Sequence, residues 1–424
     1  MSLNKREFLK LGGAIAGTTL LAGSCAGSVP KSPASPSGLH SITKGVVPVS
    51  VADRKTRIAK AQELMTEAGL DAVVIEPGST MVYFSGIRWW RSERLTALVI
   101  PRTGDIAVVT PYFEEPSVRE SMTFGEDVRT WHEHENPFTL IAGILADRGM
   151  QAAKVGCEKT VRYFVVEGLQ SLSKFEVAGA QQVVDGCRMY KSAHEIALMQ
   201  KASEVTLLAY AHVHKNLQSG MSAEDIKSLM AQAQRDLGGQ SPWGLALLGP
   251  ASAYPHGSKQ VTEVQEGQIV LMDCGCAVEG YQSDISRTFV YGTPSTEQRK
   301  MWTAVRKGQE VAFESAQLGR TAGSVDDAVR AYYESLGYGP DYKTPGLSHR
   351  TGHGIGMDGH ESTNIVRGNA TPLAPGMCFS NEPGLYDFAK FGVRLEDCIY
   401  MTETGPRWFT VPPKSIEQPL GTLG

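Results

Sequence analysis

The sequence predicts a chain of two folded domains, an α/β domain followed by a larger α+β domain. Its 424 residues are enough for two or three domains, each with a core of its own. In residues 51–186, helical periodicity alternates with short apolar strands, which is the pattern of an α/β domain. In residues 187–424, β-hairpins are separated by long amphipathic helices, which is the α+β pattern.

The composition narrows the class of function. The chain has 41 Lys and Arg residues and 45 Asp and Glu residues, so its formal net charge is −4, and 42% of its residues are hydrophobic. This balance is typical of a globular protein and excludes a mainly disordered, collagen-like or coiled-coil chain. With a pI of about 6.2, the chain offers no global basic field for nucleic acid. We therefore expect a small molecule or a peptide as the partner, and no nucleic acid.

Residues 1–25 are typical of an export signal. Lys5 and Arg6 precede the apolar, small-residue stretch 11–23, in the order found in such signals. The segment resembles a twin-arginine signal, with Lys5-Arg6 in place of the arginine pair. Cys25 closes a stretch that resembles a lipoprotein processing site, which would tether the exported, periplasmic protein to a membrane. An uncleaved apolar anchor is the alternative.

The stretch between this signal and the first domain is rich in Ser, Pro and Gly, which predicts a flexible linker over residues 26–50. The α/β domain that follows is expected to contain a helix, three strands, a helix and a strand at 54–69, 72–75, 96–101, 106–110, 139–149 and 154–157, in that order. His132 and His134 flank Glu133 in an expected loop, where a solvated cluster is favoured over a metal site. We expect this domain to supply shape and no chemistry.

The α+β domain is expected to contain four helices, at 193–218, 223–237, 297–318 and 325–336. His212 and His214 lie two residues apart in the first helix, so they point to different faces and cannot hold one ion together. Beyond Cys25, we expect buried free thiols rather than disulfides at Cys157, Cys187, Cys274, Cys276, Cys378 and Cys398.

The chemistry-bearing residues lie in two predicted hairpins of this domain. Asp273 interrupts the apolar strand 269–275, and Asp284 lies where the chain returns after a turn. Glu382 and Glu396 repeat this arrangement in the second hairpin, and His353 lies between the hairpins in a glycine-rich segment. Carboxylates inside apolar strands are costly to bury unless they are paired or bind a metal. Four of them with one histidine indicate a dinuclear metal site.

The surrounding motifs carry a family resemblance. Around the five residues stand Asp-Cys-Gly, Ser-Asp-Ile-Ser-Arg-Thr, Gly-His-Gly-Ile-Gly, Asn-Glu-Pro-Gly and Val-Arg-Leu-Glu-Asp. In this order they resemble the pita-bread metallopeptidases, which include methionine aminopeptidase, aminopeptidase P and prolidase. The resemblance covers about residues 186–413. Because an α/β block precedes it, the chain is more similar to the aminopeptidase P and prolidase branch, whose creatinase-type N-terminal domain this block would be.

The resemblance implies a role for each ligand. Asp273 would hold one metal, His353 and Glu382 the other, and Asp284 and Glu396 would bridge both. One imidazole and four carboxylates form a hard site that suits Mn²⁺, with Co²⁺, Fe²⁺ or Zn²⁺ as competitors. Two ions about 3.5 Å apart would lower the pKa of a shared water and polarise the scissile carbonyl. Glu382 is the candidate to take the proton of that water.

Three further residues match positions around the family's site, and a fourth, His349, is a separate candidate. His256 and His360 would be catalytic, contacting the substrate carbonyl or the tetrahedral intermediate, and Arg394 would orient a ligand carboxylate such as Asp284 or Glu396. His349 is expected as a substrate-binding residue of the pocket.

The resemblance implies an exported exopeptidase that hydrolyses Xaa-Pro bonds, and a homodimer is usual for it. A dipeptidase would need to recognise a nearby carboxylate, for which Arg367 is a candidate without a matching family position. Whether the chain is a dipeptidase or an aminopeptidase stays open. A non-peptide hydrolase or lyase on the same fold is the first alternative, and a non-catalytic binding module is the second. Trp243 could line the substrate mouth, whereas core or interface packing is favoured for Trp89 and Trp90.

Overall fold

The structure is a computed structural model that describes residues 38–260 and 262–424. The predicted export signal with Cys25, and the first part of the predicted linker, lie outside the described residues. Residues 39–50, expected as the rest of the linker, pack against the folded chain: the Ile42 N–H donates to the Leu237 carbonyl (2.9 Å), and Leu39 and Ile42 contact an apolar core. Within the described ranges, no helix is long and apolar enough to cross a membrane.

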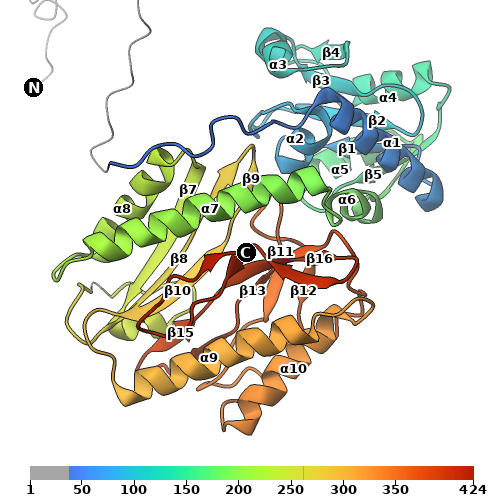
Figure 1. The fold of residues 1–424 in the computed structure, drawn as a ribbon. Coiled ribbons are helices and arrows are strands. Elements are labelled where there is room, and N and C mark those ends of the chain that lie inside the picture. Colours follow the sequence, from blue (N-terminus) through green and yellow to red (C-terminus); the bar gives the residue numbers. More distant parts are fainter. Residues whose placement is uncertain (1–37, 261) are drawn as a thin grey trace, which may run out of the picture. The chain divides into compact units, whose positions relative to one another are not determined.

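The first domain is built on a six-stranded mixed sheet with the order β4-β3-β2-β1-β5-β6 (Figure 1). Its elements are α1 (Val51–Ala68), β1 (Ala72–Ile75), α2 (Ser79–Ser85), β2 (Ala97–Pro101), β3 (Ala107–Pro111), η1 (Tyr112–Glu114), α3 (Glu115–Ser121), β4 (Asp127–Trp131), α4 (Phe138–Asp147), β5 (Ala153–Cys157), α5 (Tyr163–Gln170), β6 (Phe175–Gly179) and α6 (Gln181–Arg188). All four residues of β1 are buried, because separate apolar cores cover the two faces of the sheet. The α/β prediction is confirmed.

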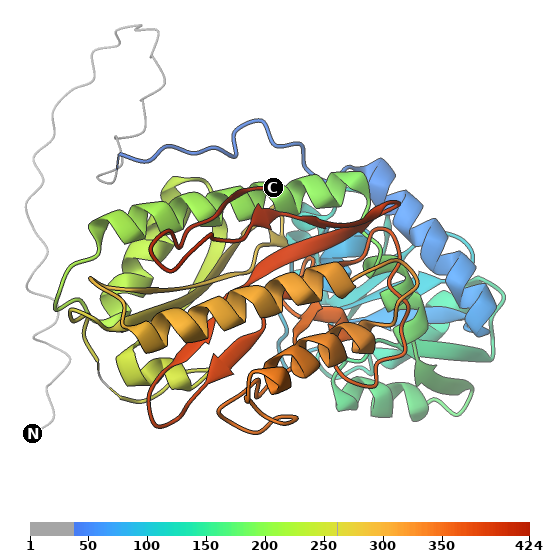
Figure 2. The same ribbon diagram turned by 60° about the horizontal axis from the view of Figure 1, so that its bottom comes forward.

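The second domain places two sheets between two pairs of helices. Its elements are α7 (Ala193–Asn216), α8 (Ala223–Asp236), β7 (Gln240–Leu248), η2 (Gly249–Ala253), β8 (Ile269–Val278), β9 (Tyr281–Gln282), β10 (Ile285–Val290), α9 (Thr296–Ser315), α10 (Ala322–Ser335), β11 (Gly352–Gly354), β12 (Glu361–Ile365), β13 (Cys378–Asn381), β14 (Gly384–Tyr386), β15 (Gly392–Arg394), β16 (Asp397–Thr402), β17 (Gly405–Trp408), β18 (Thr410–Val411) and β19 (Thr422–Leu423). One sheet has the order β10-β8-β7, with β9 paired to β8, and the other has the order β12-β11-β13-β16-β17. Helices α7 and α8 lie on one side of the strands and α9 and α10 on the other (Figures 1 and 2).

The alternation of side chains along β8 determines which way the carboxylate of Asp273 points. Val270, Met272 and Cys274 belong to the core under α7 and α8. Ile269 and Leu271 belong to the core that contains α9 and α10. Because side chains alternate along a strand, Asp273 faces the same way as Ile269 and Leu271, into the space between the sheets.

The predicted helices of this domain begin and end within a few residues of their expected bounds, and local capping explains why. Ser192, Ser222 and Ser295 each form a capping box at the start of α7, α8 and α9. Both predicted hairpins are also present. β8 pairs with β10, while the second hairpin divides into the pairs β14–β15 and β13–β16.

Candidate metal centre and catalytic cavity

The five predicted ligands come from separate strands that the two sheets bring together. Asp273 lies within β8 and Asp284 immediately before β10. His353 is the middle residue of β11, Glu382 follows β13, and Glu396 lies between β15 and β16. Asp273 is the register partner of Ser286, which also forms a β-bridge with Glu396. That bridge joins the two sheets at the site, so the predicted cluster exists.

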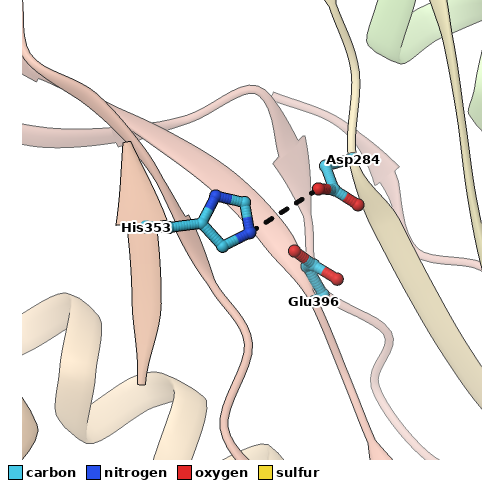
Figure 3. Close-up of side chains that lie close together, drawn as sticks. All are labelled: Asp284, His353 and Glu396. Carbon is cyan, nitrogen blue, oxygen red and sulfur yellow. Dashed lines mark ion pairs between the residues drawn. The ribbon is translucent and has the colours of Figure 1, made fainter. Parts of the chain in front are cut away.

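The centre of the cluster is formed by Asp284, His353 and Glu396, whose ligand atoms lie within 4.8 Å of one another (Figure 3). His353 Nε2 is 3.8 Å from Asp284 Oδ2 and 3.2 Å from Glu382 Oε1. Asp284, His353 and Glu396 are each no more than 5% exposed. The imidazole and three carboxylates therefore lie together in one small, mostly buried volume.

The unsatisfied oxygens of this cluster fit divalent cations. Oδ1 of Asp273, Oδ1 of Asp284 and Oε1 of Glu396 are buried and have no hydrogen-bond partner among residues 38–260 and 262–424. Burial, followed by repulsion from neighbouring carboxylates, raises the pKa of Asp284 and Glu396 well above their usual range. Burial raises the pKa of Glu382 to about 7. Buried carboxylates that lack donors and repel one another are what a bound cation would satisfy.

His353 is oriented as a metal ligand. Its Nδ1–H donates to the Gly354 carbonyl (3.1 Å), which leaves the lone pair of Nε2 directed at the carboxylates. Burial lowers the pKa of His353 to about 3, and the nearby His360 acts in the same direction. The imidazole is therefore neutral at ordinary pH, as a ligand nitrogen must be.

Arg394 holds two of the carboxylates through two of its nitrogens. Its Nη2 donates to Asp273 Oδ2 (2.7 Å), and its Nε donates to Ser286 Oγ (3.0 Å). Ser286 Oγ in turn donates to Glu396 Oε2 (2.8 Å). Arg394 therefore binds a predicted ligand carboxylate, as expected, but this carboxylate belongs to Asp273 and not to the two residues given as examples, Asp284 and Glu396. It binds Asp273, because β15 packs against β8 and β10, and it reaches Glu396 only through the hydroxyl of Ser286, the β10 residue that is bridged to Glu396.

His349 belongs to a second hydrogen-bonded chain that ends on the same arginine. Its Nδ1–H donates to the Arg350 carbonyl (2.7 Å), so Nε2 accepts a hydrogen bond from the Tyr386 hydroxyl (2.8 Å). Burial lowers the pKa of His349 to about 3, and the charge of Arg394 lowers it further, which keeps the ring neutral. Nη1 of Arg394 donates to the Tyr386 hydroxyl (3.4 Å). His349 therefore lies in the site, with its nitrogens occupied by the protein.

A cavity of about 720 Å³ opens over the carboxylates. Besides the five predicted ligands, its lining comprises Trp243, His256, Gln282, His349, Arg350, Gly359, His360 and Arg394. The ring of His360 packs edge-on against His353, with centroids 4.1 Å apart, and burial lowers its pKa. All the predicted site residues within the described chain thus meet in one cavity, which Trp243 also lines.

Other sequence candidates lie elsewhere. Arg367 is exposed and bonds to Asp327 and Asp341, so it does not face the cavity and is not the carboxylate-binding group considered above. His132 and His134 stack on each other in an exposed turn. Trp90 is 64% exposed rather than buried in a core. All six cysteines of the described residues are buried free thiols, as predicted.

Sequence reasoning missed three residues that complete the site: Ser286, Tyr386 and Arg350. Ser286 is part of the quoted Ser-Asp-Ile-Ser-Arg-Thr motif, and its position two residues after Asp284 was the signal available. Arg350 directly follows His349. Tyr386 carries no local signal, because only the pairing of β14 with β15 brings its hydroxyl to Arg394.

Comparisons with known proteins agree with this geometry. Residues 197–403 match the family model of metallopeptidase family M24, and residues 57–190 match the family model of the creatinase/prolidase N-terminal domain. A probable dipeptidase PepE of Mycobacterium tuberculosis is 33% identical over 353 residues, covering 82% of this chain and 92% of that protein. A Xaa-Pro dipeptidase of Lactobacillus helveticus is 30% identical over 365 residues, covering 84% and 97%.

Solved structures give the same result. The crystal structure of dipeptidase PepE from Mycobacterium ulcerans has a TM-score of 0.81 and 32% identity, covering 87% of this chain and 98% of that one. A prolidase from Thermococcus sibiricus has a TM-score of 0.76 and 29% identity, covering 84% and 96%. The chain therefore belongs to metallopeptidase family M24, with a creatinase/prolidase N-terminal domain before a pita-bread catalytic domain, and it is a peptidase.

Proposed function

We propose that this peptidase is a Xaa-Pro dipeptidase with two divalent metal ions. The observation that carries the proposal is the complete set of four carboxylates and one neutral imidazole, with three buried oxygens that receive no hydrogen bond from the described part of the chain. The Xaa-Pro dipeptidase of Lactobacillus helveticus and the prolidase of Thermococcus sibiricus support the choice of substrate.

The residues present assign the metal sites. Asp273 would hold one ion, His353 and Glu382 the other, and Asp284 and Glu396 would bridge them, consistent with their central position. The oxygen-rich donor set suits Mn²⁺, with Co²⁺, Fe²⁺ or Zn²⁺ as competitors. When bound, the ions would supply Lewis acidity that activates a water and polarises the scissile carbonyl.

The protein groups of the cavity would do the remaining work. Glu382 is the carboxylate placed to accept the proton of the attacking water. Its Oε1 lies 3.2 Å from Nε2 of His353, at the edge of the cluster. His256 and His360 line the cavity and would donate hydrogen bonds to the negative charge that develops on the substrate oxygen. Arg394 would keep Asp273 and, through Ser286, Glu396 in place.

The test is hydrolysis of matched peptides by the protein lacking residues 1–25 and loaded with Mn²⁺. We expect release of alanine from Ala-Pro, much less from Ala-Pro-Ala, and none from Ala-Ala. Preferred cleavage of Ala-Pro-Ala would make the enzyme an aminopeptidase instead. No release from any peptide, with two metals bound, would indicate a non-peptide substrate.

Two ligand variants test the metal assignment. We expect Asp284→Ala and Glu396→Ala each to lose activity and bound metal together, because each removes a carboxylate from the centre of the cluster. Retention of activity and metal by either variant would contradict the two-metal proposal. A protein that binds metal and peptide but hydrolyses nothing would be a binding module.

We also propose that the protein is exported to the periplasm by residues 1–25, by the twin-arginine route, and that it forms a homodimer. The order of Lys5 and Arg6 before the apolar stretch supports the export step, and Cys25 is the candidate lipid attachment site. Cell fractionation of the intact chain and of a Lys5→Gln, Arg6→Gln variant tests the route, with accumulation of the variant in the cytoplasm as the expected result. Light scattering tests the dimer.

A further inference from the structure

The catalytic cavity is lined by two arginines that are held in different ways. Arg394 directs its nitrogens to Asp273, Ser286, Tyr386 and the Pro255 carbonyl. Arg350 donates only from Nη1, to Oδ1 of the neutral Asn364 side chain (2.9 Å), and forms no ion pair within residues 38–260 and 262–424. A guanidinium has five N–H donors, so Arg350 keeps unused donors for the cavity that it lines, and its charge acts on the nearby Glu382 carboxylate.

The backbone that carries Arg350 is rigidly held. Thr351 donates from its N–H (3.1 Å) and its hydroxyl (2.7 Å) to Oδ1 of Asp326, a fully buried residue of α10. The carbonyl of Thr351 accepts from the N–H of Glu382 (2.9 Å). Asn364, which anchors the guanidinium, is the register partner of His353 on the neighbouring strand. Arg350 is therefore fixed next to two predicted ligands rather than carried on a loose loop.

We propose that Arg350 binds the free carboxylate of a Xaa-Pro dipeptide and so confines the enzyme to dipeptides. This assignment rests on the proposed function and names the group that selects its substrate. In Xaa-Pro the carboxylate is attached to the carbon next to the scissile nitrogen, whereas a longer peptide presents a neutral amide there. A guanidinium fork matches a carboxylate in charge and in geometry, and it gains much less from an amide.

The experiment compares Ala-Pro with Ala-Pro-amide, which has the same scissile bond and no carboxylate. The variant Arg350→Met removes the charge and keeps most of the side-chain volume. Arg367→Met is the matched control, because Arg367 is an exposed arginine outside the cavity. Arg350→Lys keeps the charge without the fork. Circular dichroism and bound-metal content establish that each variant is folded and loaded.

We expect Arg350→Met to lower kcat/KM for Ala-Pro by about 10- to 100-fold, mainly through KM, and to leave Ala-Pro-amide within about twofold. Arg350→Lys should recover part of the loss, and Arg367→Met should change neither substrate. Equal losses on both substrates would show that Arg350 only supports the site, and no loss on either would show that it does not meet the carboxylate. Either of these results would overturn the assignment of Arg350 and would leave the proposed function intact. Inactivity of the unmodified enzyme on both substrates would overturn the proposed function as well.

Discussion

Ser286 should control metal affinity although it binds no metal itself. Its hydroxyl accepts a hydrogen bond from Arg394 Nε (3.0 Å) and donates to Glu396 Oε2 (2.8 Å), and its side chain is fully buried. The substitution Ser286→Ala removes one oxygen and breaks both bonds. The other Glu396 oxygen has no partner among the described residues, so the carboxylate would lose the one hydrogen bond that they give it.

The magnitude follows from these two bonds. A hydrogen bond to a charged group contributes about 1.5–3 kcal/mol, and loss of a group that orients a ligand typically weakens metal binding about 10- to 100-fold. These ranges agree, because about 1.4 kcal/mol corresponds to a tenfold change in Kd. We therefore expect Ser286→Ala to raise the Kd for Mn²⁺ by about 10- to 100-fold, measured by isothermal titration calorimetry on metal-free protein.

Ser252→Ala is the control for this measurement. Ser252 is also fully buried, but its hydroxyl contacts only the main chain of Gly249 and Gly392. Its loss should lower stability and leave the Kd for Mn²⁺ within about twofold. An unchanged Kd in Ser286→Ala, or an equal loss in Ser252→Ala, would refute the reasoning.

Three further perturbations have defined outcomes. In metal-free protein the free energy of unfolding should fall as the pH rises from about 4.5 to about 7. Burial raises the pKa of Glu382 to about 7, so over this range the folded state keeps a proton that the unfolded state loses. Urea unfolding at about pH 5 and about pH 8 measures this decline, and saturating Mn²⁺ should remove it. Arg287→Met should destabilise the fold by about 3–5 kcal/mol in urea unfolding, because the fully buried carboxylate of Asp397 loses its ion-pair partner and keeps only its neutral donors, Gln309 and Thr410. A smaller loss than that of Ser252→Ala would contradict this. Glu361→Gln should lower kcat/KM by up to about 100-fold with metal content unchanged, because Glu361 ties the segment beside His360 to Lys191 (3.0 Å); a simultaneous loss of metal would point to a different role.

Much of the fold could be predicted from local patterns. Strand β1 was predicted over its observed range, 72–75, because an apolar run follows a helix that ends on Gly69, which adopts φ of 65°. The amphipathic helices α8 and α9 were predicted within a few residues, since serine caps mark where they begin. The five ligands could be identified because charged residues inside apolar strands are rare without a function.

The connections between ligands could not be read from local patterns. The partner of Arg394 depends on which strands lie side by side, and the bridge between Ser286 and Glu396 joins residues 110 positions apart. Arg367 and Arg350 illustrate the same limit of local sequence patterns. Both are arginines near the Gly-His-Gly motif, but only the pairing of β11 with β12 determines which one lines the cavity.

The first domain contributes to the site through contacts rather than through ligands. Arg188, at the end of α6, donates to Thr80 Oγ1 (2.7 Å) in the first domain and to Glu361 Oε1 (2.5 Å) in the second. Glu361 adjoins His360, so the position of a cavity histidine depends on how the two domains meet. Burial alone would raise the pKa of Glu361, but the charges of Lys191 and Arg188 bring it down to about 2. A carboxylate with a pKa this low is ionised at neutral pH, so its contacts with Arg188 and Lys191 are charged ion pairs under the conditions of an activity assay.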